Sequence, residues 1–217
     1  MEELGVDYYF EQPDPGLASL LTACDHVWDL LGAPLVEFVK IRLVPGREGR
    51  VMAGAFVDED VYLGAGTVVE PGAYIKGPTI IGRDCEIRHG AYIRGGVWIG
   101  DHCVVGHATE VKNSIFLSGA KAGHFAYIGD SVLGSNVNLG AGTKLANLKI
   151  VRGTVSVVLA GQRFDSGLRK FGAILGDGVE TGCNSVTSPG TMLGRRAMVY
   201  PCVNVRGFHP HGTVIKA

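Results

Sequence analysis

Apolar residues recur at every sixth position through much of this chain, and this period constrains the fold more than any other feature. The first block of these positions comprises Leu63, Val69, Ile75, Ile81, Ile87, Ile93, Ile99, Val105, Val111 and Leu117. The period then slips to Ala122, resumes at Ile128, slips again to Leu133, and continues at Leu139, Leu145, Leu175, Thr181, Thr187, Leu193, Val199 and Val205. Six residues suffice for a short strand and a tight corner, and three such units form a triangular coil of about 18 residues. The period therefore predicts an all-β fold, a hexapeptide-repeat parallel β-helix of roughly eight coils.

The composition agrees with this architecture and excludes several other classes of protein. Glycine accounts for 33 of 217 residues, which suits corners that need a positive φ or leave no room for a Cβ. The net charge of -1 argues against a nucleic-acid arm or a polybasic membrane anchor. No apolar run approaches the roughly 20 residues of a membrane helix, and the first residues lack the features of a signal peptide. We expect a cytoplasmic protein with no nucleic-acid partner and no membrane partner.

Two segments do not share the period. Residues 1–50 carry a helical stripe that ends at Gly32, and we expect a short N-terminal helical cap that covers the open first coil. Residues 149–170 alternate in polarity around Gly161, which predicts a β-hairpin excursion from the prism. The β-helix domain then comprises residues 51–217. Known hexapeptide β-helices are left-handed, and we expect the same hand here. The residues of the helical stripe are Leu17, Leu20, Leu21, Cys24, Val27, Trp28, Leu30 and Leu31.

The coil period brings polar residues that are distant in sequence onto common edges and faces. His89, His107 and His124 each follow a core position by two residues, so we expect them to stack along one corner. Arg94 and Lys112 each follow a core position by one residue, which predicts a pair of cations on the neighbouring face. A lone surface histidine or asparagine has an ordinary structural explanation, but a base that titrates near neutral pH beside phosphate-binding cations indicates a site. Further candidates near these positions are Glu110, Tyr127, Asn138 and Asn147.

The segment LSGAKAGHFAYIGDSVLGSNVNLGAGTKLANLK, residues 117–149, resembles the C-terminal acetyltransferase domain of the bifunctional N-acetylglucosamine-1-phosphate uridyltransferase. The resemblance extends over residues 61–148 and, more weakly, 171–210. It implies that His124 is the base that deprotonates the sugar amine. We expect Glu110 to tune this base. The residues that it implies for the sugar phosphate, the sugar and the acetyl-transfer point are Arg94, Lys112, Tyr127, Asn138 and Asn147. For acetyl-CoA it implies the backbone at Ala141 and the position of Cys183, where the family has a serine.

This resemblance implies an acetyl-CoA-dependent N-acetyltransferase that acts on an amino-sugar 1-phosphate of the glucosamine-1-phosphate type, as in UDP-N-acetylglucosamine biosynthesis. A triangular prism has flat faces and offers its deep cleft between two copies, so we expect a homotrimer. No metal is required by this chemistry. Nucleotidyl transfer is not expected of this chain, because residues 1–60 have no glycine-rich, basic nucleotide-binding signature.

Two alternatives come from other classes of function. The first is a non-catalytic β-helix that binds a sugar nucleotide or serves as an oligomerisation scaffold, suggested by Leu148, Lys149 and Ile150 where the family has Tyr-Asp-Gly. The second is a metalloenzyme that resembles γ-class carbonic anhydrases, with His102, His107 and His124 as zinc ligands. Five cysteines without a CxxC pair argue against a structural zinc site, and we expect them to be small buried residues. They are Cys24, Cys85, Cys103, Cys183 and Cys202.

Overall fold

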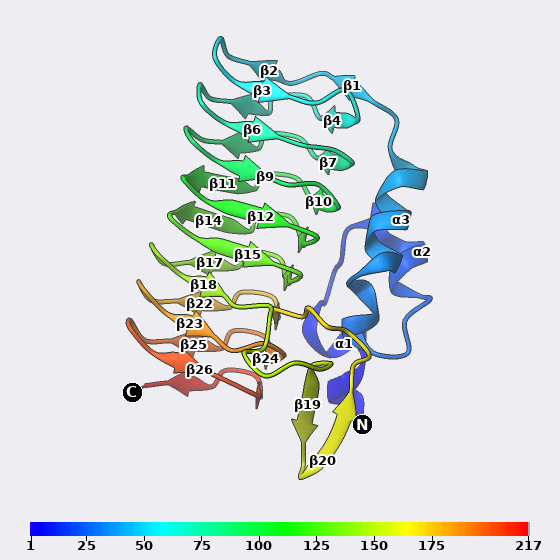
Figure 1. Ribbon diagram of the computed structural model, residues 1–217, viewed down its shortest axis with the longest axis vertical. Helices are drawn as coiled ribbons and strands as arrows, with labels where there is room; N and C mark the ends of the chain where they lie inside the picture. The colour runs from blue at the N-terminus through cyan, green and yellow to red at the C-terminus, as the bar shows by residue number, and fades with distance from the viewer. Residues whose placement is uncertain (217) are drawn as a thin grey trace.

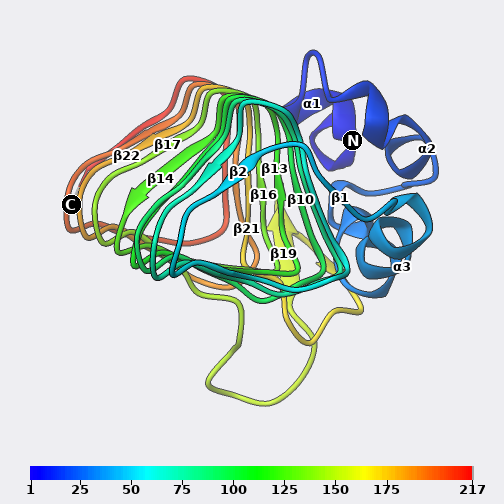
Figure 2. The same cartoon turned by 90° about the horizontal axis from the view of Figure 1, so that it is seen from above.

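The computed structural model describes residues 1–216, and it is a parallel β-helix with a helical segment along one side (Figure 1). Viewed from its first coil, the chain turns counterclockwise as it recedes from the viewer, so the β-helix is left-handed (Figure 2). Two of its sheets have nine strands and the third has eight. The predicted fold class is therefore confirmed, with about one coil more than expected.

Three parallel sheets form the faces of the prism, and each coil contributes one strand to each of them, except that the last coil has strands only in sheets A and B. Sheet A contains β1 (Gly46–Arg47), β4 (Val61–Leu63), β7 (Thr79–Ile81), β10 (Val97–Ile99), β13 (Ile115–Phe116), β16 (Val132–Leu133), β21 (Ala173–Leu175), β24 (Thr191–Leu193) and β27 (Phe208–His209). Sheet B contains β2 (Arg50–Val51), β5 (Val68–Val69), β8 (Glu86–Ile87), β11 (Val104–His107), β14 (Lys121–His124), β17 (Asn138–Leu139), β22 (Glu180–Thr181), β25 (Met198–Val199) and β28 (Val214–Ile215). Sheet C contains β3 (Phe56–Val57), β6 (Tyr74–Ile75), β9 (Tyr92–Ile93), β12 (Glu110–Lys112), β15 (Tyr127–Gly129), β18 (Lys144–Leu145), β23 (Val186–Thr187) and β26 (Asn204–Val205).

The predicted six-residue positions form the buried core of the prism, with one correction. Ile99 pairs with Phe116 across the coils, so Phe116 occupies the core position that we had predicted for Leu117. The six-residue period is shortened by one residue between Val111 and Phe116, whereas the sequence analysis placed this shortening between Leu117 and Ala122. Leu117 is also buried, but in a second apolar cluster that includes the outer face of sheet A. Two adjacent apolar residues fit the period equally well, so the sequence alone did not distinguish them.

The helical segment does not cover the first coil, and this part of the prediction is wrong. The stripe is divided among short helical turns, and the longest helix begins after Gly32 instead of ending there. These helices pack against the outer face of sheet A, where Trp98 donates a hydrogen bond from Nε1 to Asp14 Oδ2 at 3.3 Å. Phe56 in the first coil is 65% exposed. The elements are η1 (Glu2–Leu4), α1 (Val6–Tyr9), η2 (Pro15–Leu17), α2 (Ala18–Leu21), η3 (Val27–Leu30) and α3 (Ala33–Arg42).

An apolar outer face explains why the helices lie there. Several strands of sheet A are buried on both faces, because apolar residues occupy outward as well as inward positions. A sheet face of this kind needs a second layer, and the helices supply it. The division into residues 1–50 and 51–217 stays a prediction, although β1 already places residues 46–47 in the first coil.

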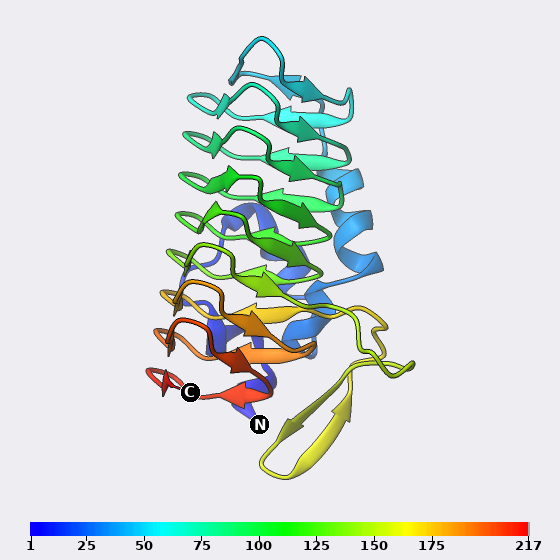
Figure 3. The ribbon, with the colours of Figure 1, turned by 60° about the vertical axis from the view of Figure 1, so that its left-hand side comes forward.

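The predicted hairpin is present within residues 149–170. Strands β19 (Ser156–Leu159) and β20 (Gln162–Asp165) pair antiparallel. Ala160 and Gly161 between them both have positive φ, 48° and 79°, as a two-residue hairpin turn requires. The hairpin leaves the prism and lies beside its last coils (Figure 3). Its Val157 and Leu159 side chains are buried in the same apolar cluster as the helical segment.

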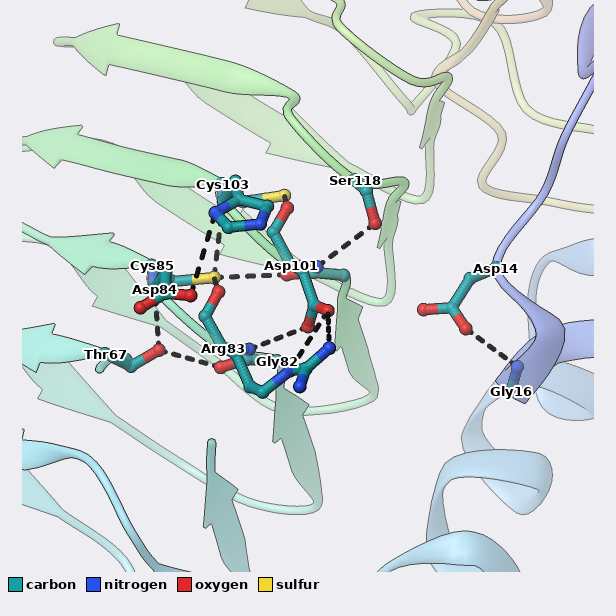
Figure 4. Close-up of polar contacts among 12 residues, drawn as sticks. Asp14, Gly16, Thr67, Gly82, Arg83, Asp84, Cys85, Asp101, Cys103 and Ser118 are labelled. Atoms are coloured by element: carbon teal, nitrogen blue, oxygen red, sulfur yellow. Dashed lines mark hydrogen bonds and ion pairs between the residues drawn. The ribbon is translucent and has the colours of Figure 1, made fainter. Parts of the chain in front are cut away.

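Two of the five cysteines are buried, Cys24 is half-buried, and the other two are exposed. Cys85 and Cys103 lie one coil apart inside the prism, and the Cys103 N–H donates to Cys85 Sγ at 3.4 Å (Figure 4). A hydrogen bond between the two thiol groups, together with burial, raises the pKa of the Cys103 thiol. Cys183 and Cys202 are exposed, so the prediction of burial is wrong for these two. Within residues 1–216, no helix is long and apolar enough to cross a membrane.

Candidate functional site

The corners that connect sheet B to sheet C, here called the B–C edge, carry most of the predicted catalytic and cofactor-binding positions. His89, His107, His124, Ala141 and Cys183 occupy the first turn position in five successive coils. Backbone hydrogen bonds align these five positions. The carbonyl of each residue accepts a hydrogen bond from the backbone N–H of the second turn residue in the following coil. The N···O distances of these five bonds lie between 2.8 and 3.2 Å. The residue expected to act as base and the two expected to meet acetyl-CoA therefore share one edge.

The histidine side chains on this edge differ in their surroundings. The rings of His89 and His107 are stacked with centroids 5.4 Å apart. Nδ1 of His107 lies 2.8 Å from the His89 carbonyl oxygen, and Nδ1 of His89 lies 2.6 Å from that of Pro71. Since a carbonyl only accepts, each Nδ1 carries the proton. His124 is exposed and its ring has no hydrogen-bond partner among residues 1–216. Its two ring nitrogens are therefore open to a ligand.

Phe125 separates His124 from the other two rings. It lies in the left-handed backbone region with φ 51° and is 56% exposed. Its ring meets the edge of the His107 ring at a centroid distance of 5.0 Å, and the His124 ring at 6.4 Å. The stack of histidines therefore ends at His107, and the side chain of His124 stands apart from it.

The predicted cations lie on the outer face of sheet C, and each has a carboxylate partner. Arg94 Nη1 is 2.7 Å from Glu110 Oε1, and this hydrogen bond raises the pKa of the Arg94 guanidinium. Lys112 Nζ is 3.4 Å from Asp130 Oδ2. Glu110 thus contacts Arg94, and within residues 1–216 it makes no hydrogen bond to His124. The interpretation of Glu110 as a neighbour that tunes His124 has no contact to support it.

Asp130 organises a buried network that the sequence analysis did not identify. It is only 3% exposed, and it accepts hydrogen bonds from the side-chain amides of Asn147 and, at 3.3 Å, Asn113. Asn147 in turn accepts a hydrogen bond from the Tyr127 hydroxyl at 3.4 Å. Asp130 therefore holds the side chains of Lys112 and Asn147 in place. Through Asn147 it also positions the Tyr127 hydroxyl. In the sequence, Asp130 could have been identified as the aspartate at the end of the GHFAYIGD stretch.

Gly129 leaves the space that this network needs. A Cβ at this position would lie 2.6 Å from Asn147 Nδ2 and 2.8 Å from the Tyr127 hydroxyl. Both distances are shorter than non-bonded contacts allow, so any larger residue would displace these side chains. The close packing accounts for the glycine beside Asp130.

Other predicted residues lie apart from this network. Asn138 is exposed on the outer face of sheet B, between Lys121 and Glu180 of the adjoining coils. His102 lies on the edge between sheets A and B, where it lines a cavity of about 560 Å³ together with Arg196. The structure therefore does not bring His102 to the edge that carries His107 and His124. No group of three or more His, Cys, Asp or Glu side chains in residues 1–216 has a metal-binding arrangement.

Comparisons with known proteins agree with the expected resemblance to a C-terminal acetyltransferase domain. A family model described as the GMPPB C-terminal domain matches residues 75–209. The chain is 44% identical over 88 residues to a bifunctional sugar-1-phosphate nucleotidylyltransferase/acetyltransferase of Sulfurisphaera tokodaii, covering 41% of this chain and 22% of that protein. It is 37% identical over 86 residues to the bifunctional protein GlmU of Methanococcus vannielii, covering 40% of this chain and 20% of that protein. The chain thus spans about a fifth of the length of these curated relatives. Among solved structures, a UDP-N-acetylglucosamine acyltransferase from Campylobacter jejuni aligns with a TM-score of 0.46 and 18% identity, covering 74% of this chain and 69% of that chain.

Proposed function

We propose that this chain, which belongs to the GMPPB C-terminal domain family, is an acetyl-CoA-dependent N-acetyltransferase acting on an amino-sugar 1-phosphate of the glucosamine-1-phosphate type. The observation that carries the proposal is the exposed His124 ring, which has no hydrogen-bond partner among residues 1–216 and lies one coil from Ala141 on the same edge. The adjoining face of sheet C presents the Tyr127 hydroxyl and the Arg94 guanidinium. A base, a hydroxyl and a cation in this arrangement suit an amine that is attached to a phosphorylated sugar.

The reaction follows from these positions. His124 takes a proton from the substrate amine as the amine nitrogen attacks the carbonyl carbon of the thioester. The carbon–sulfur bond then breaks, the acetyl group remains on the nitrogen as an amide, and the CoA thiolate leaves and takes up a proton. No acetyl group is attached to the enzyme at any stage, and the chemistry needs no metal ion.

The charge that develops on the carbonyl oxygen needs a hydrogen-bond donor. Asn147 is a poor choice, because its side chain is buried and its amide group already donates to Asp130. The backbone N–H of Ala141 donates to no oxygen among residues 1–216, and it lies one coil from His124. We therefore assign the oxyanion contact to the Ala141 N–H.

A second copy of the chain completes the cleft in this proposal. In a single chain His124 lies on an open edge, whereas thioester chemistry benefits from exclusion of water. Helices and hairpin already cover the outer face of sheet A, so the uncovered sheets B and C remain for contacts with other copies. We expect a homotrimer of about 69 kDa, three times the 22.9 kDa of one chain.

The proposal is tested by mixing the purified protein with acetyl-CoA and glucosamine 1-phosphate and following release of the CoA thiol. We expect turnover that depends on both substrates and an N-acetylated product by mass spectrometry. Light scattering at micromolar concentration, measured on the same sample, should give the trimer mass. Failure to acetylate any amino sugar, in a sample that is trimeric and folded, would favour the scaffold interpretation instead.

A further inference from the structure

A row of aromatic side chains extends from the candidate site toward the N-terminal coils. On the outer face of sheet C, Phe56, Tyr74 and Tyr92 occupy the same register position in three successive coils. Their ring centroids are 6.2 Å and 5.7 Å apart, and Phe56 and Tyr74 are 65% and 37% exposed. The same position in the next two coils is held by Glu110 and Tyr127 of the candidate site. Strands β3, β6, β9, β12 and β15 stack one below another in Figure 1.

A row of cations lies beside the aromatic row, two residues further along each strand. Lys76, Arg94 and Lys112 each follow the core residue of three successive coils. Lys76 Nζ is 5.7 Å from the centroid of the Tyr74 ring, and Arg94 Cζ is 6.0 Å from that of Tyr92. Unlike the other two cations, Lys76 has no carboxylate within 4.0 Å among residues 1–216. The face therefore combines exposed rings with an unpaired positive charge.

The proposed reaction predicts the direction in which a larger substrate would extend over this surface. If the amine lies at His124 and the 1-phosphate at Arg94, the line from amine to phosphate points up the prism toward Lys76 and Tyr74. Each coil adds about 4.8 Å to this distance. A group attached to the far side of the 1-phosphate would therefore extend along the two rows. A second phosphate would reach Lys76, and a flat ring beyond it would reach Tyr74 and Phe56.

We infer that the substrate is the amino sugar joined to a nucleoside diphosphate, with the second phosphate on Lys76 and the base stacked on Tyr74 and Phe56. This inference rests on the proposed function and specifies its substrate class. Aromatic rings stack on any nucleobase through its π-face, and lysine and arginine bind phosphate by charge-assisted hydrogen bonds. A bare sugar 1-phosphate would leave the rings exposed to water and Lys76 without a partner. The nucleoside diphosphate accounts for both.

The first experiment measures binding without turnover, by calorimetric titration of UDP and GDP into the full-length protein. We expect at least one of them to bind, and Tyr74→Ala to weaken its affinity by about tenfold, because stacking of a base on an aromatic ring is lost. Tyr74→Phe keeps the ring and should restore the affinity. Lys76→Met should weaken binding, and Lys76→Arg should restore it. Tyr200→Ala is the matched control, because Tyr200 is 49% exposed and has Lys216 Nζ 4.9 Å from its ring centroid, but lies near the other end of the prism.

The second experiment compares kcat/KM for UDP-glucosamine, GDP-glucosamine and glucosamine 1-phosphate. We expect at least one nucleotide derivative to be preferred by about tenfold or more, and Tyr74→Ala to reduce this preference. Equal kcat/KM values together with no binding of UDP or GDP would overturn the inference and leave the proposed acetyl transfer intact. Dissociation of the oligomer by Tyr74→Ala would also overturn it, since the aromatic row would then be an interface between copies. Absence of acetyl transfer to all three amines would contradict the proposed function and, with it, the role of the nucleotide as part of a substrate. The titration would still decide whether the two rows bind a nucleoside diphosphate, because it does not depend on turnover.

Discussion

Replacing Asp130 by asparagine should destabilise the fold mainly by removing the charge that neutralises Lys112, and it also removes one of the two oxygens that accept hydrogen bonds from Asn113 and Asn147. The two side chains are 4% and 11% exposed, with Lys112 Nζ 3.4 Å from the carboxylate. Asparagine is nearly isosteric and tolerates the left-handed backbone of this position, where φ is 48°. Breaking a buried ion pair by removing one partner costs about 3–5 kcal/mol. We expect the lower end, about 3 kcal/mol, because Lys112 retains some contact with water. For a chain of this size that corresponds to a decrease in Tm of about 6–12 °C.

The assay is unfolding in denaturant, followed by circular dichroism, on three proteins. Besides the wild type and Asp130→Asn, it includes the double variant Lys112→Met/Asp130→Asn, which removes the unpaired charge. The double variant should recover part of the lost unfolding free energy, because no uncompensated cation then remains buried. A free energy of unfolding for Asp130→Asn within about 0.5 kcal/mol of the wild type would refute the reasoning, since surface substitutions fall in that range. A double variant less stable than Asp130→Asn would refute it as well.

Four further outcomes are expected from the structure. Arg94→Ala should raise the KM for the phosphorylated substrate by about 10- to 100-fold and leave the KM for acetyl-CoA nearly unchanged, because a charge-assisted contact is lost; equal effects in steady-state kinetics would mean that the cation serves the other substrate. Gly129→Ala should displace Asn147 and lower the unfolding free energy by about 1–3 kcal/mol, measured in denaturant. Trp98→Ala should cost about 3–5 kcal/mol and expose the helical segment to limited proteolysis. The two exposed cysteines should react with a thiol reagent in the folded protein, whereas Cys103 should react only after unfolding, because its pKa is raised and its side chain is buried.

The β-helix could be predicted because its physical basis is local and periodic. One inward residue every six positions suffices to define the coil, the core and the shared edge of the histidines. The choice between Phe116 and Leu117 could not be made from the period, since both are apolar and the corner between strands is able to lose a residue. Placing the helices failed for another reason. The apolar outer face of sheet A is encoded in three-residue strands such as Val97–Ile99, but the six-residue period identifies only the inward positions.

The sequence predicted which residues share the edge of the candidate site, but it did not predict which side chains contact one another. The coil period placed His124 on the same corner as His89. It gave no information about which carboxylate each cation would meet, because the period fixes the row of a residue and not the direction of its side chain. Asp130 was not identified as a site residue because it does not face solvent. Its role is to hold other side chains, and only the three-dimensional contacts reveal that.

The central claim, that His124 is the base for acetyl transfer at the B–C edge, is tested most directly by kcat for His124→Ala beside His89→Ala. The two residues share one edge column, but His89 is stacked on His107 while the ring of His124 has no hydrogen-bond partner within the described chain. We predict that His124→Ala lowers kcat by about 10²–10⁴-fold, the usual contribution of a general base, with acetyl-CoA affinity and Tm nearly unchanged. His89→Ala should retain most of its activity. Full turnover by a folded His124→Ala protein would contradict the assignment.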